Sequence, residues 1–357
     1  MAAATTTLPA TMKAWQYGNE RGGLANLRLN NAATPPKPPK AGSQLVLIEV
    51  ISMALNPADY KLPRLPVLPR LLIPKPASPG LDFCGRVVSS AEGAENDPNH
   101  EPLKPGQLVF GRLNWLYQHG TLGQFILCPR VGIAPLPSGI EIDQAAAIST
   151  AGQTAYQSLA PYVREGSRVF VNGGSGGVGT FTIQIAKLLG CHVTVSCSGR
   201  NEELCRGLGA DEVVDYTKGN LGEMLKAKGL VFDLLVDNVG RPLDLYKASD
   251  AFLAPGAPYV QVAASGDSVD GILAMLSRSL LPSFLGGGKH PWRIIMIKDS
   301  AEELVRIGQW VKEGKIKVTL DEVFAFEDAP EAYKKLKTGR ARGKIVVNVT
   351  ERPKIDL

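Results

Sequence analysis

The chain has 357 residues, which is long enough for two domains that each bury a hydrophobic core. Its composition is that of an ordinary globular protein, with 44% hydrophobic residues, 20% charged residues and a formal net charge of +5. The lysines and arginines are scattered along the chain, which excludes the basic face or stripe of a nucleic-acid-binding protein.

Cysteine usage and the N-terminus indicate the compartment. The cysteines, Cys84, Cys128, Cys191, Cys197 and Cys205, are odd in number and lack C-x-x-C spacing, which predicts free thiols in a reducing environment. Residues 1–12 contain neither an apolar signal core nor an acidic residue. A cytoplasmic protein is therefore expected, and a mitochondrial address stays open.

Short strands dominate the first part of the chain. Runs of apolar residues at 12–17, 45–52, 80–89, 105–110 and 123–127 alternate with loops rich in glycine and proline. Many short strands punctuated in this way predict an all-β, barrel-like domain. A helix is expected over residues 145–159, where the chain passes into a second domain.

A glycine-rich stretch separates an expected strand, residues 169–172, from an expected helix, residues 181–189. Gly174, Gly176 and Gly179 fit G-x-G-x-x-G, and this spacing at a strand–turn–helix junction is typical of dinucleotide binding. The helix N-terminus and the loop residues Ser175, Gly177 and Val178 then face the pyrophosphate. An ordinary glycine-rich turn is the alternative.

The end of the next expected strand, residues 191–196, indicates which cofactor binds. An NAD site places Asp or Glu there to bind the ribose 2′-hydroxyl. This chain instead has Ser196 and Ser198, followed by Arg200 and Asn201. Hydroxyls and a guanidinium favour a 2′-phosphate, so the cofactor is predicted to be NADPH. A solvent-facing arginine at a strand end is the alternative.

Two further parallel strands are expected, residues 231–237 and 259–264. Ligands in such sheets bind beyond the carboxyl ends of the strands, so Asn238, Val239 and Ala263 are predicted to flank the nicotinamide. Asp237 is predicted to cap the turn that follows its strand. Together these elements predict an α/β protein with a doubly wound parallel sheet.

The apolar stretch 271–285 is too short and too interrupted to cross a bilayer. It could line a substrate pocket, lie in a homodimer interface, touch a membrane surface or form a core helix, and a pocket or lid is preferred. Amphipathic helices are expected over residues 300–313, with Leu304, Ile307 and Val311 facing inward, and over residues 327–336. A strand over residues 342–349 closes the chain.

The ordered motifs at residues 56–61, 79–85 and 151–156, followed by the glycine loop, resemble the medium-chain dehydrogenase/reductase superfamily. Within it the chain resembles the zinc-independent branch of quinone oxidoreductases and enoyl reductases. The resemblance implies a GroES-like β-barrel catalytic domain, residues 1–148 and 299–357, and a Rossmann NADPH-binding domain, residues 149–298.

The resemblance also implies site residues. Asn56, Tyr60 and Lys61 match the segment that lines the catalytic cleft, with Tyr60 or Lys61 as hydrogen-bond donor and Asn56 as an organiser of substrate or nicotinamide. An Asn56 that caps its turn and a solvated Lys61 are the alternatives. The matches to cofactor-contacting segments are Thr154, Tyr216, Arg342, Gly343 and Lys344. Asn56, Leu81 and Asp82 stand where zinc-dependent relatives have metal ligands, so no metal is expected.

The expected activity is hydride transfer from NADPH to a quinone or an α,β-unsaturated carbonyl compound, because such acceptors need little activation without a metal. An enoyl reductase for polyketide or fatty-acyl thioesters, acting with a synthase partner, is one alternative. A non-enzymatic NADPH-binding protein is the other. The substrate is expected to be small and lipophilic, and family members commonly form homodimers.

Overall fold

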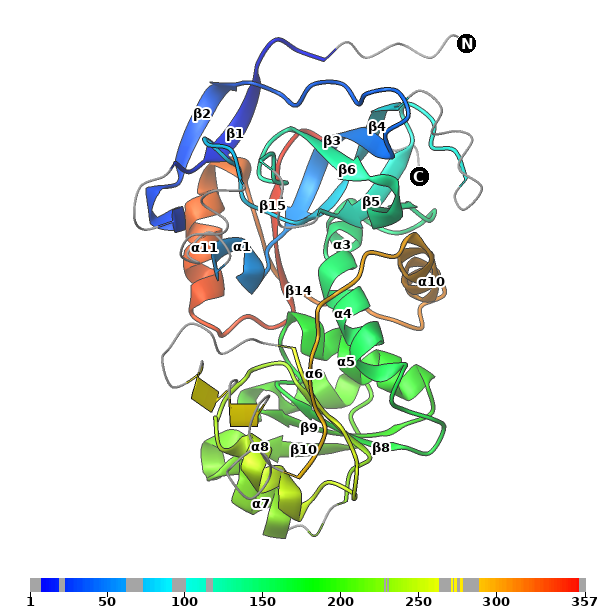
Figure 1. The fold of residues 1–357 in the computed structure, drawn as a ribbon, viewed down its shortest axis with the longest axis vertical. Helices are drawn as coiled ribbons and strands as arrows, with labels where there is room; N and C mark the ends of the chain where they lie inside the picture. The colour runs from blue at the N-terminus through cyan, green and yellow to red at the C-terminus, as the bar shows by residue number, and fades with distance from the viewer. Residues whose placement is uncertain are drawn as a thin grey trace. The chain divides into compact units, whose positions relative to one another are not determined.

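The structure is a computed structural model, and it describes residues 8–18, 23–61, 73–91, 101–113, 118–227, 229, 231–262, 271, 273, 274, 277, 278 and 289–352. The chain divides into two compact units (Figure 1). The first comprises Met1–Thr150, Lys298–Gly314 and Leu320–Leu357, and the second comprises Ala151–Ile297 and Lys315–Thr319.

The first unit is built on a seven-stranded sheet in the order β14-β15-β3-β4-β5-β7, with β6 also paired to β3 (Figure 1). Its strands are β3 (Leu45–Ala54), β4 (Asp82–Ser90), β5 (Leu108–Arg112), β6 (Phe125–Pro129), β7 (Ile133–Pro135), β14 (Leu320–Phe324) and β15 (Lys344–Asn348). β1 (Met12–Gln16) and β2 (Arg28–Ala33) form a separate antiparallel pair. The long apolar strand β3 is almost wholly buried because it pairs with β15, β4 and β6.

Short helices cover this sheet: α1 (Pro57–Lys61), α3 (Ile142–Ala146), α10 (Ala301–Lys312) and α11 (Ala329–Lys337). The Ser300 hydroxyl accepts a hydrogen bond from the amide of Glu303 at 3.2 Å, which caps the N-terminus of α10. Leu304 and Ile307 of α10 are buried, as predicted, while Val311 is only partly buried.

The second unit is a six-stranded parallel sheet in the order β10-β9-β8-β11-β12-β13. Its strands are β8 (Arg168–Asn172), β9 (His192–Cys197), β10 (Glu212–Asp215), β11 (Leu234–Asp237), β12 (Tyr259–Gln261) and β13 (Trp292–Ile294). Its helices are α4 (Ser149–Leu159), α5 (Gly177–Leu188), α6 (Glu202–Gly207), α7 (Leu221–Ala227) and α8 (Leu245–Ala248), and α4 belongs to this unit from Ala151 onward. Numbered from β8, the order is 3-2-1-4-5-6, the doubly wound Rossmann arrangement that the sequence predicts.

Among the boundaries that differ from the sequence predictions, four bear on the domain division and the expected site. The helix expected over 145–159 is interrupted after α3, where the amide of Ala147 bonds the carbonyl oxygens of Gln144 and Ala145, and the alanine-rich sequence gives no sign of this break. α5 begins at Gly177, earlier than the expected start at residue 181. β12 ends at Gln261. Ala263 and most of the 271–285 stretch lie outside the described residues.

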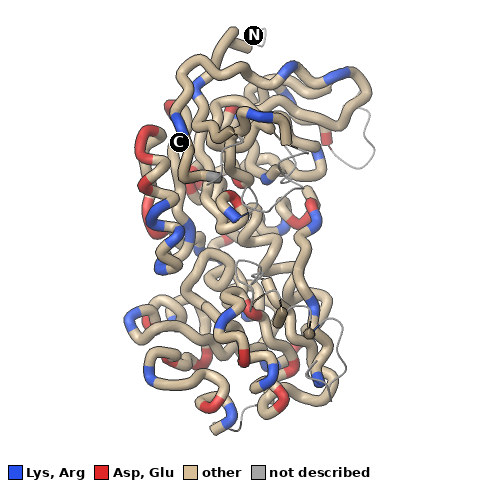
Figure 2. The backbone as a smooth tube through the Cα atoms, turned by 60° about the vertical axis from the view of Figure 1, so that its left-hand side comes forward, with Lys and Arg blue, Asp and Glu red and all other residues tan. Residues whose placement is uncertain are grey.

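The fourth difference concerns residues 315–319, which the predicted division assigns to the first domain. They group with the second unit because the Gln184 side chain bonds both backbone groups of Lys317. Figure 2 shows acidic and basic residues interspersed along the backbone of each unit. None of the described helices has the length and hydropathy that a membrane span requires.

Candidate active site

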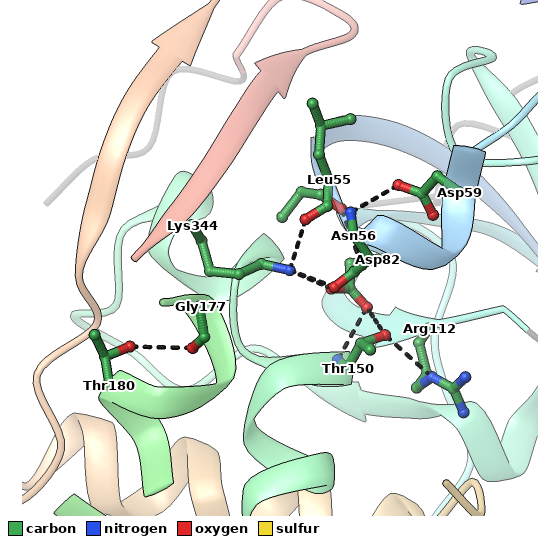
Figure 3. Close-up of polar contacts among 10 residues, drawn as sticks. Leu55, Asn56, Asp59, Asp82, Arg112, Thr150, Gly177, Thr180 and Lys344 are labelled. Atoms are coloured by element: carbon green, nitrogen blue, oxygen red, sulfur yellow. Dashed lines mark hydrogen bonds and ion pairs between the residues drawn. The ribbon is translucent and has the colours of Figure 1, made fainter. Parts of the chain in front are cut away.

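A lysine ammonium lies buried in the first unit (Figure 3). Lys344 Nζ donates hydrogen bonds to Leu55 O at 3.0 Å, to Asn56 Oδ1 at 2.7 Å and to Asp82 Oδ2 at 3.1 Å. Only 3% of Lys344 and none of Asp82 is exposed to solvent. An ammonium has three hydrogens, so these three acceptors use its entire donor capacity.

The strand register brings these distant residues together. β15 runs antiparallel to β3 with Val346 opposite Ala54, so Lys344, two residues earlier, falls beside Asn56, two residues later. β3 also pairs with β4, where Ala54 lies opposite Asp82. The cluster therefore depends on the pairing of three strands rather than on any local motif.

Asp82 receives hydrogen bonds on both of its oxygens. Oδ2 accepts from Lys344 and from Asn56 Nδ2, the latter at 2.9 Å, while Oδ1 accepts from the Thr150 amide at 2.9 Å and from the Thr150 hydroxyl. The Thr150 hydroxyl also accepts from Arg112 Nε at 3.3 Å, and Arg112 pairs with Asp299. The buried carboxylate is thus fully hydrogen-bonded, as a buried charge requires.

These bonds change the roles that the sequence suggested for two residues. Asn56 was expected to organise the substrate, but its amide joins Lys344 to Asp82, and Asp59 caps the turn by accepting the Asn56 amide at 2.8 Å. Lys344 was expected to approach the cofactor, but its three donors are all used inside the unit. We therefore treat both as positioning residues of the site.

The donor set does not fit a zinc ion. Zinc in proteins requires thiolate, imidazole or carboxylate ligands in tetrahedral geometry. At the expected ligand positions, Asn56 offers an amide and Asp82 a carboxylate, and the positively charged ammonium of Lys344 is bonded to both. Among the described residues, no group of three or more His, Cys, Asp or Glu side chains could hold a metal ion.

Helix α1 carries the two predicted hydrogen-bond donors, Tyr60 and Lys61, and both are partly exposed. The ammonium of Lys337 lies 5.8 Å from the centre of the Tyr60 ring. Asp59 on the same helix is buried, and burial raises its pKa to about 7, with the charge of Asp82 adding to the rise and the Asn56 amide and Lys344 opposing it. Tyr60 and Lys61 stay predictions as hydrogen-bond donors to the substrate.

The glycine loop of the second unit has one open position and two tight ones. A Cβ atom at Gly179 would lie 2.1 Å from Gly173 O, and one at Gly174 would lie 2.9 Å from Val195 Cβ. A Cβ atom at Gly176 would meet nothing nearer than Gly173 O at 3.8 Å. Gly176 is the N-cap residue of α5. Because glycine has no side chain that could accept hydrogen bonds from the first amides of the helix, these amides are available to an anion.

Buried side chains hold this loop in place. The Ser196 hydroxyl donates to Asn172 Oδ1 at 2.7 Å and accepts from the Gly173 amide at 3.0 Å. Asn172 Nδ2 donates to Asp237 Oδ1 at 2.8 Å. Ser196 is fully buried, so the role predicted for it as a 2′-phosphate ligand is corrected to that of a support for the loop.

The turn after β11 confirms one prediction and adds an observation. Asp237 Oδ1 accepts the amides of Val239 at 3.1 Å and Gly240 at 2.8 Å, so Asp237 caps this turn as predicted. Neither polar atom of the Asn238 side chain has a hydrogen-bond partner within the part of the chain that the structure describes. A buried, unpartnered amide at the carboxyl end of a parallel strand is a position that a bound cofactor would satisfy.

The adenosine end of the expected site is only partly buried. Ser198 is half-buried and Arg200 is exposed beyond the end of β9, while Asn201 Nδ2 donates to the Ser175 hydroxyl at 3.0 Å. Tyr216 is 51% exposed. The cofactor contacts of these residues remain predictions, as do those of the buried Thr154 and Gly343 and the exposed Arg342. Ala263 lies outside the described residues.

Asp215, the acid at the end of β10, is not among the predicted site residues. Its Oδ1 accepts the Thr217 amide at 3.0 Å and the Thr217 hydroxyl at 2.7 Å, and these bonds lower its pKa. A Cβ atom at Gly199 would lie 2.6 Å from Asp215 Oδ2. The signal available in the sequence is an acid that ends the strand β10. This strand follows the one at whose end a ribose-binding acid is expected.

The glycine positions yield a paired prediction. Gly179→Ala is expected to lower the thermal midpoint and dinucleotide affinity together, because its Cβ atom would collide with Gly173 O. Gly176→Ala is expected to keep the midpoint but weaken NADPH binding at least tenfold, because its methyl group fits the free loop and occupies the space kept for the pyrophosphate. Calorimetry and fluorescence titration of both variants test this. Unchanged NADPH affinity of Gly176→Ala would contradict it.

Comparisons with known proteins agree with this geometry. A family model described as zinc-binding dehydrogenase matches residues 208–347. Trans-enoyl reductase pgmF of Aspergillus terreus is 47% identical over 352 residues, covering 97% of this chain and 98% of that protein. A quinone oxidoreductase structure from Coxiella burnetii superposes with a TM-score of 0.78 at 26% identity, covering 95% of this chain and 99% of that chain. A mycobacterial structure, Rv1454c complexed with NADPH, has a TM-score of 0.74 at 22% identity, covering 95% and 100%.

Proposed function

The chain belongs to the zinc-binding dehydrogenase family of the medium-chain dehydrogenase/reductase superfamily, and from this premise we propose that it is an NADPH-dependent reductase of α,β-unsaturated carbonyl compounds that needs no metal ion. Its relatives are named as reductases and oxidoreductases, so it is an oxidoreductase. The proposal concerns the cofactor, the acceptor and the groups that activate it.

The observation that carries the proposal is the ammonium of Lys344 between Asn56 and Asp82. With this cluster in place of metal ligands, the carbonyl oxygen is polarised only by hydrogen bonds from the protein. A conjugated acceptor suits such a site, because negative charge developing at the oxygen is delocalised and one well-placed donor stabilises it. An unactivated alcohol or ketone would need stronger polarisation.

The second unit would hold the cofactor. The amides at the start of α5 and the space at Gly176 suit a pyrophosphate, and the unpartnered amide of Asn238 suits the nicotinamide end. NADPH, when bound, supplies the hydride. NADPH rather than NADH is supported by Ser198 and Arg200 beyond β9, and by the NADPH complex of the mycobacterial structural neighbour.

Tyr60 or Lys61 would donate the hydrogen bond to the acceptor's oxygen, and the buried cluster beneath α1 would keep that helix in position. The enoyl thioester is the favoured form of the acceptor, because a relative that covers almost the whole chain is named a trans-enoyl reductase. A quinone is the second candidate, supported by the quinone oxidoreductase among the solved structures.

The test is NADPH and NADH oxidation with a panel of quinones, simple enones and enoyl thioesters, with and without a chelator. Turnover that prefers NADPH and is insensitive to the chelator is expected, and the acceptor with the highest kcat/KM identifies the substrate class. Loss of activity on chelation would overturn the metal-free mechanism. Saturable NADPH binding without turnover of any acceptor would overturn the reductase assignment and favour a binding role.

Arg200 provides a prediction about cofactor choice. Arg200→Ala is expected to raise the KM for NADPH about tenfold and leave that for NADH nearly unchanged, because a charge-assisted hydrogen bond to the 2′-phosphate contributes roughly 1.5–3 kcal/mol. The matched control is Arg206→Ala, since Arg206 is an exposed arginine of α6 that pairs with Glu202. Equal effects of Arg200→Ala on both cofactors would contradict the assignment.

A further inference from the structure

A buried carboxylate ends one of the central strands of the second unit. Asp237 is the last residue of β11 and only 1% of it is exposed to solvent. Its Oδ1 accepts hydrogen bonds from Asn172 Nδ2 at 2.8 Å and from the amides of Val239 and Gly240. Its Oδ2 accepts the Tyr259 hydroxyl at 2.6 Å. Both oxygens are acceptors, which is the pattern of an ionised carboxylate, and all these partners are uncharged.

The charge of Asp237 is balanced less closely than that of the buried aspartate in the first unit. Asp82 is bonded directly to the ammonium of Lys344. In contrast, the guanidinium of Arg278 is separated from Asp237 by an aromatic ring, because its Cζ lies 6.0 Å from the centre of the Tyr259 ring whose hydroxyl bonds the carboxylate. A negative charge without a directly paired cation is costly in a protein interior, so a cationic ligand beside it would reduce that cost.

The carboxylate is next to the proposed cofactor site. Asp237 immediately precedes Asn238, whose side-chain amide has no partner in the described structure and is proposed to meet the nicotinamide end. The turn that Asp237 holds also touches the glycine loop, since a Cβ atom at Gly173 would lie 2.5 Å from Val239 Cγ2. Ligands of such sheets bind at this edge. The negative charge therefore lies one residue away from the position proposed for the nicotinamide.

We propose that the negative charge of Asp237 stabilises the oxidised, positively charged nicotinamide relative to the neutral reduced one, and so favours hydride donation. In this reaction a C–H bond of the reduced ring breaks, a C–H bond forms at the β-carbon of the acceptor, and the resulting enolate takes a proton from water. Two electrons pass to the acceptor and one positive charge stays on the ring. A fixed charge placed where that positive charge develops lowers the barrier. This inference rests on the proposed cofactor site.

The test compares the dissociation constants of NADP⁺ and NADPH, measured by fluorescence titration of NADPH and by competition with NADP⁺. A structural effect on the site weakens both cofactors alike, whereas loss of the charge weakens mainly NADP⁺. Asp237→Asn keeps an oxygen that accepts the N–H groups now bonded to Oδ1, and its amide donates to the Tyr259 hydroxyl oxygen. The ratio of Kd for NADP⁺ to Kd for NADPH is expected to rise about tenfold in this variant.

Other variants separate charge from structure. Tyr259→Phe removes the hydrogen bond to Asp237 Oδ2 but keeps the charge, so the ratio should stay unchanged even where both affinities fall. Asp233→Asn makes the same chemical change at an exposed residue just before β11, where Asp233 accepts the Arg168 amide, and it should also leave the ratio unchanged. Arg278→Met removes the opposing positive charge, so it should lower the ratio.

The contrary outcomes are distinct. An unchanged ratio in folded Asp237→Asn would overturn the role of the charge, and so would an equal rise of the ratio in Tyr259→Phe. If Asp237→Asn does not fold, Arg278→Met decides, and a ratio that does not fall in that variant overturns the proposal. If the parent protein binds neither NADPH nor NADP⁺, the proposed cofactor site itself fails. Cofactor binding with an unchanged ratio rejects the role of Asp237 and leaves the site intact.

Discussion

Replacing Lys344 by methionine is expected to destabilise the first unit by about 3–5 kcal/mol, the typical cost of breaking a buried ion pair by removing one partner. Methionine has a comparable length but no charge. Asp82, which is fully buried, would lose the ammonium that is bonded to its Oδ2, and Leu55 O and Asn56 Oδ1 would each lose a donor. Urea unfolding followed by tryptophan fluorescence measures the change, and Trp15 in the core of this unit is a suitable reporter.

Two further variants isolate the cause. Lys335→Met removes an ammonium that pairs with Asp321 and Glu322 near the surface, and it is expected to cost no more than about 1 kcal/mol. Adding Asp82→Asn to Lys344→Met removes the uncompensated buried charge, so the double variant should recover part of the lost stability. A double variant less stable than Lys344→Met alone would show that the charge of Asp82 is not what makes the loss large.

Lys344 also shows why the sequence predicted only part of the site. A lysine just before a closing strand can be matched to a family motif, but its environment depends on the antiparallel register that places Val346 opposite Ala54. Nothing near residue 344 in the chain specifies that pairing. The cluster joins β15, β3 and β4, and such long-range pairings lie beyond local sequence patterns.

The glycine loop was predictable because its constraints are local. The turn, the open position at Gly176 and the tight position at Gly179 all lie within a few residues. A Cβ atom at Gly179 would collide with Gly173 O, whereas the space at Gly176 is left for a ligand. Ser196 was misassigned because a hydroxyl at the end of a strand can face either a ligand or the loop. Only the hydrogen bonds to Asn172 and Gly173 distinguish the two.

The secondary-structure elements that local sequence patterns specify were also predicted, and an element that depends on a distant partner strand was not. The parallel sheet of the second unit follows from alternating strands and helices, which the sequence displays. The weakly apolar strand β14 (Leu320–Phe324) was not predicted, since its residues are exposed or only partly buried and it forms by pairing with β15. Strand propensity depends strongly on such neighbours.

Asp59→Asn is expected to make the protein more stable at neutral and alkaline pH. The pKa of Asp59 is raised from 3.8 to about 7 in the folded state, chiefly by burial. As pH rises from about 4 to 7 the unfolded chain loses this proton while the folded protein keeps it, so the Asp59 contribution to stability falls through this window and is constant above it. A difference of about 3 pKa units corresponds to a cost of about 4 kcal/mol above pH 7.

Asparagine removes this cost and keeps an oxygen that can accept the Asn56 amide, so the stability gain of the variant should grow from near zero at pH 4 to several kcal/mol at pH 8. The groups that surround Asp59, namely Asp82, Lys344 and Tyr333, are the same in both proteins, so the difference between variant and parent isolates one titration. Asp328→Asn, at an exposed acid, should show no comparable growth of its stability difference. Urea unfolding at several pH values provides the comparison. A gain that does not change between pH 4 and 8 would mean that Asp59 is ionised in the folded protein throughout, and that the charge of Lys344 outweighs burial.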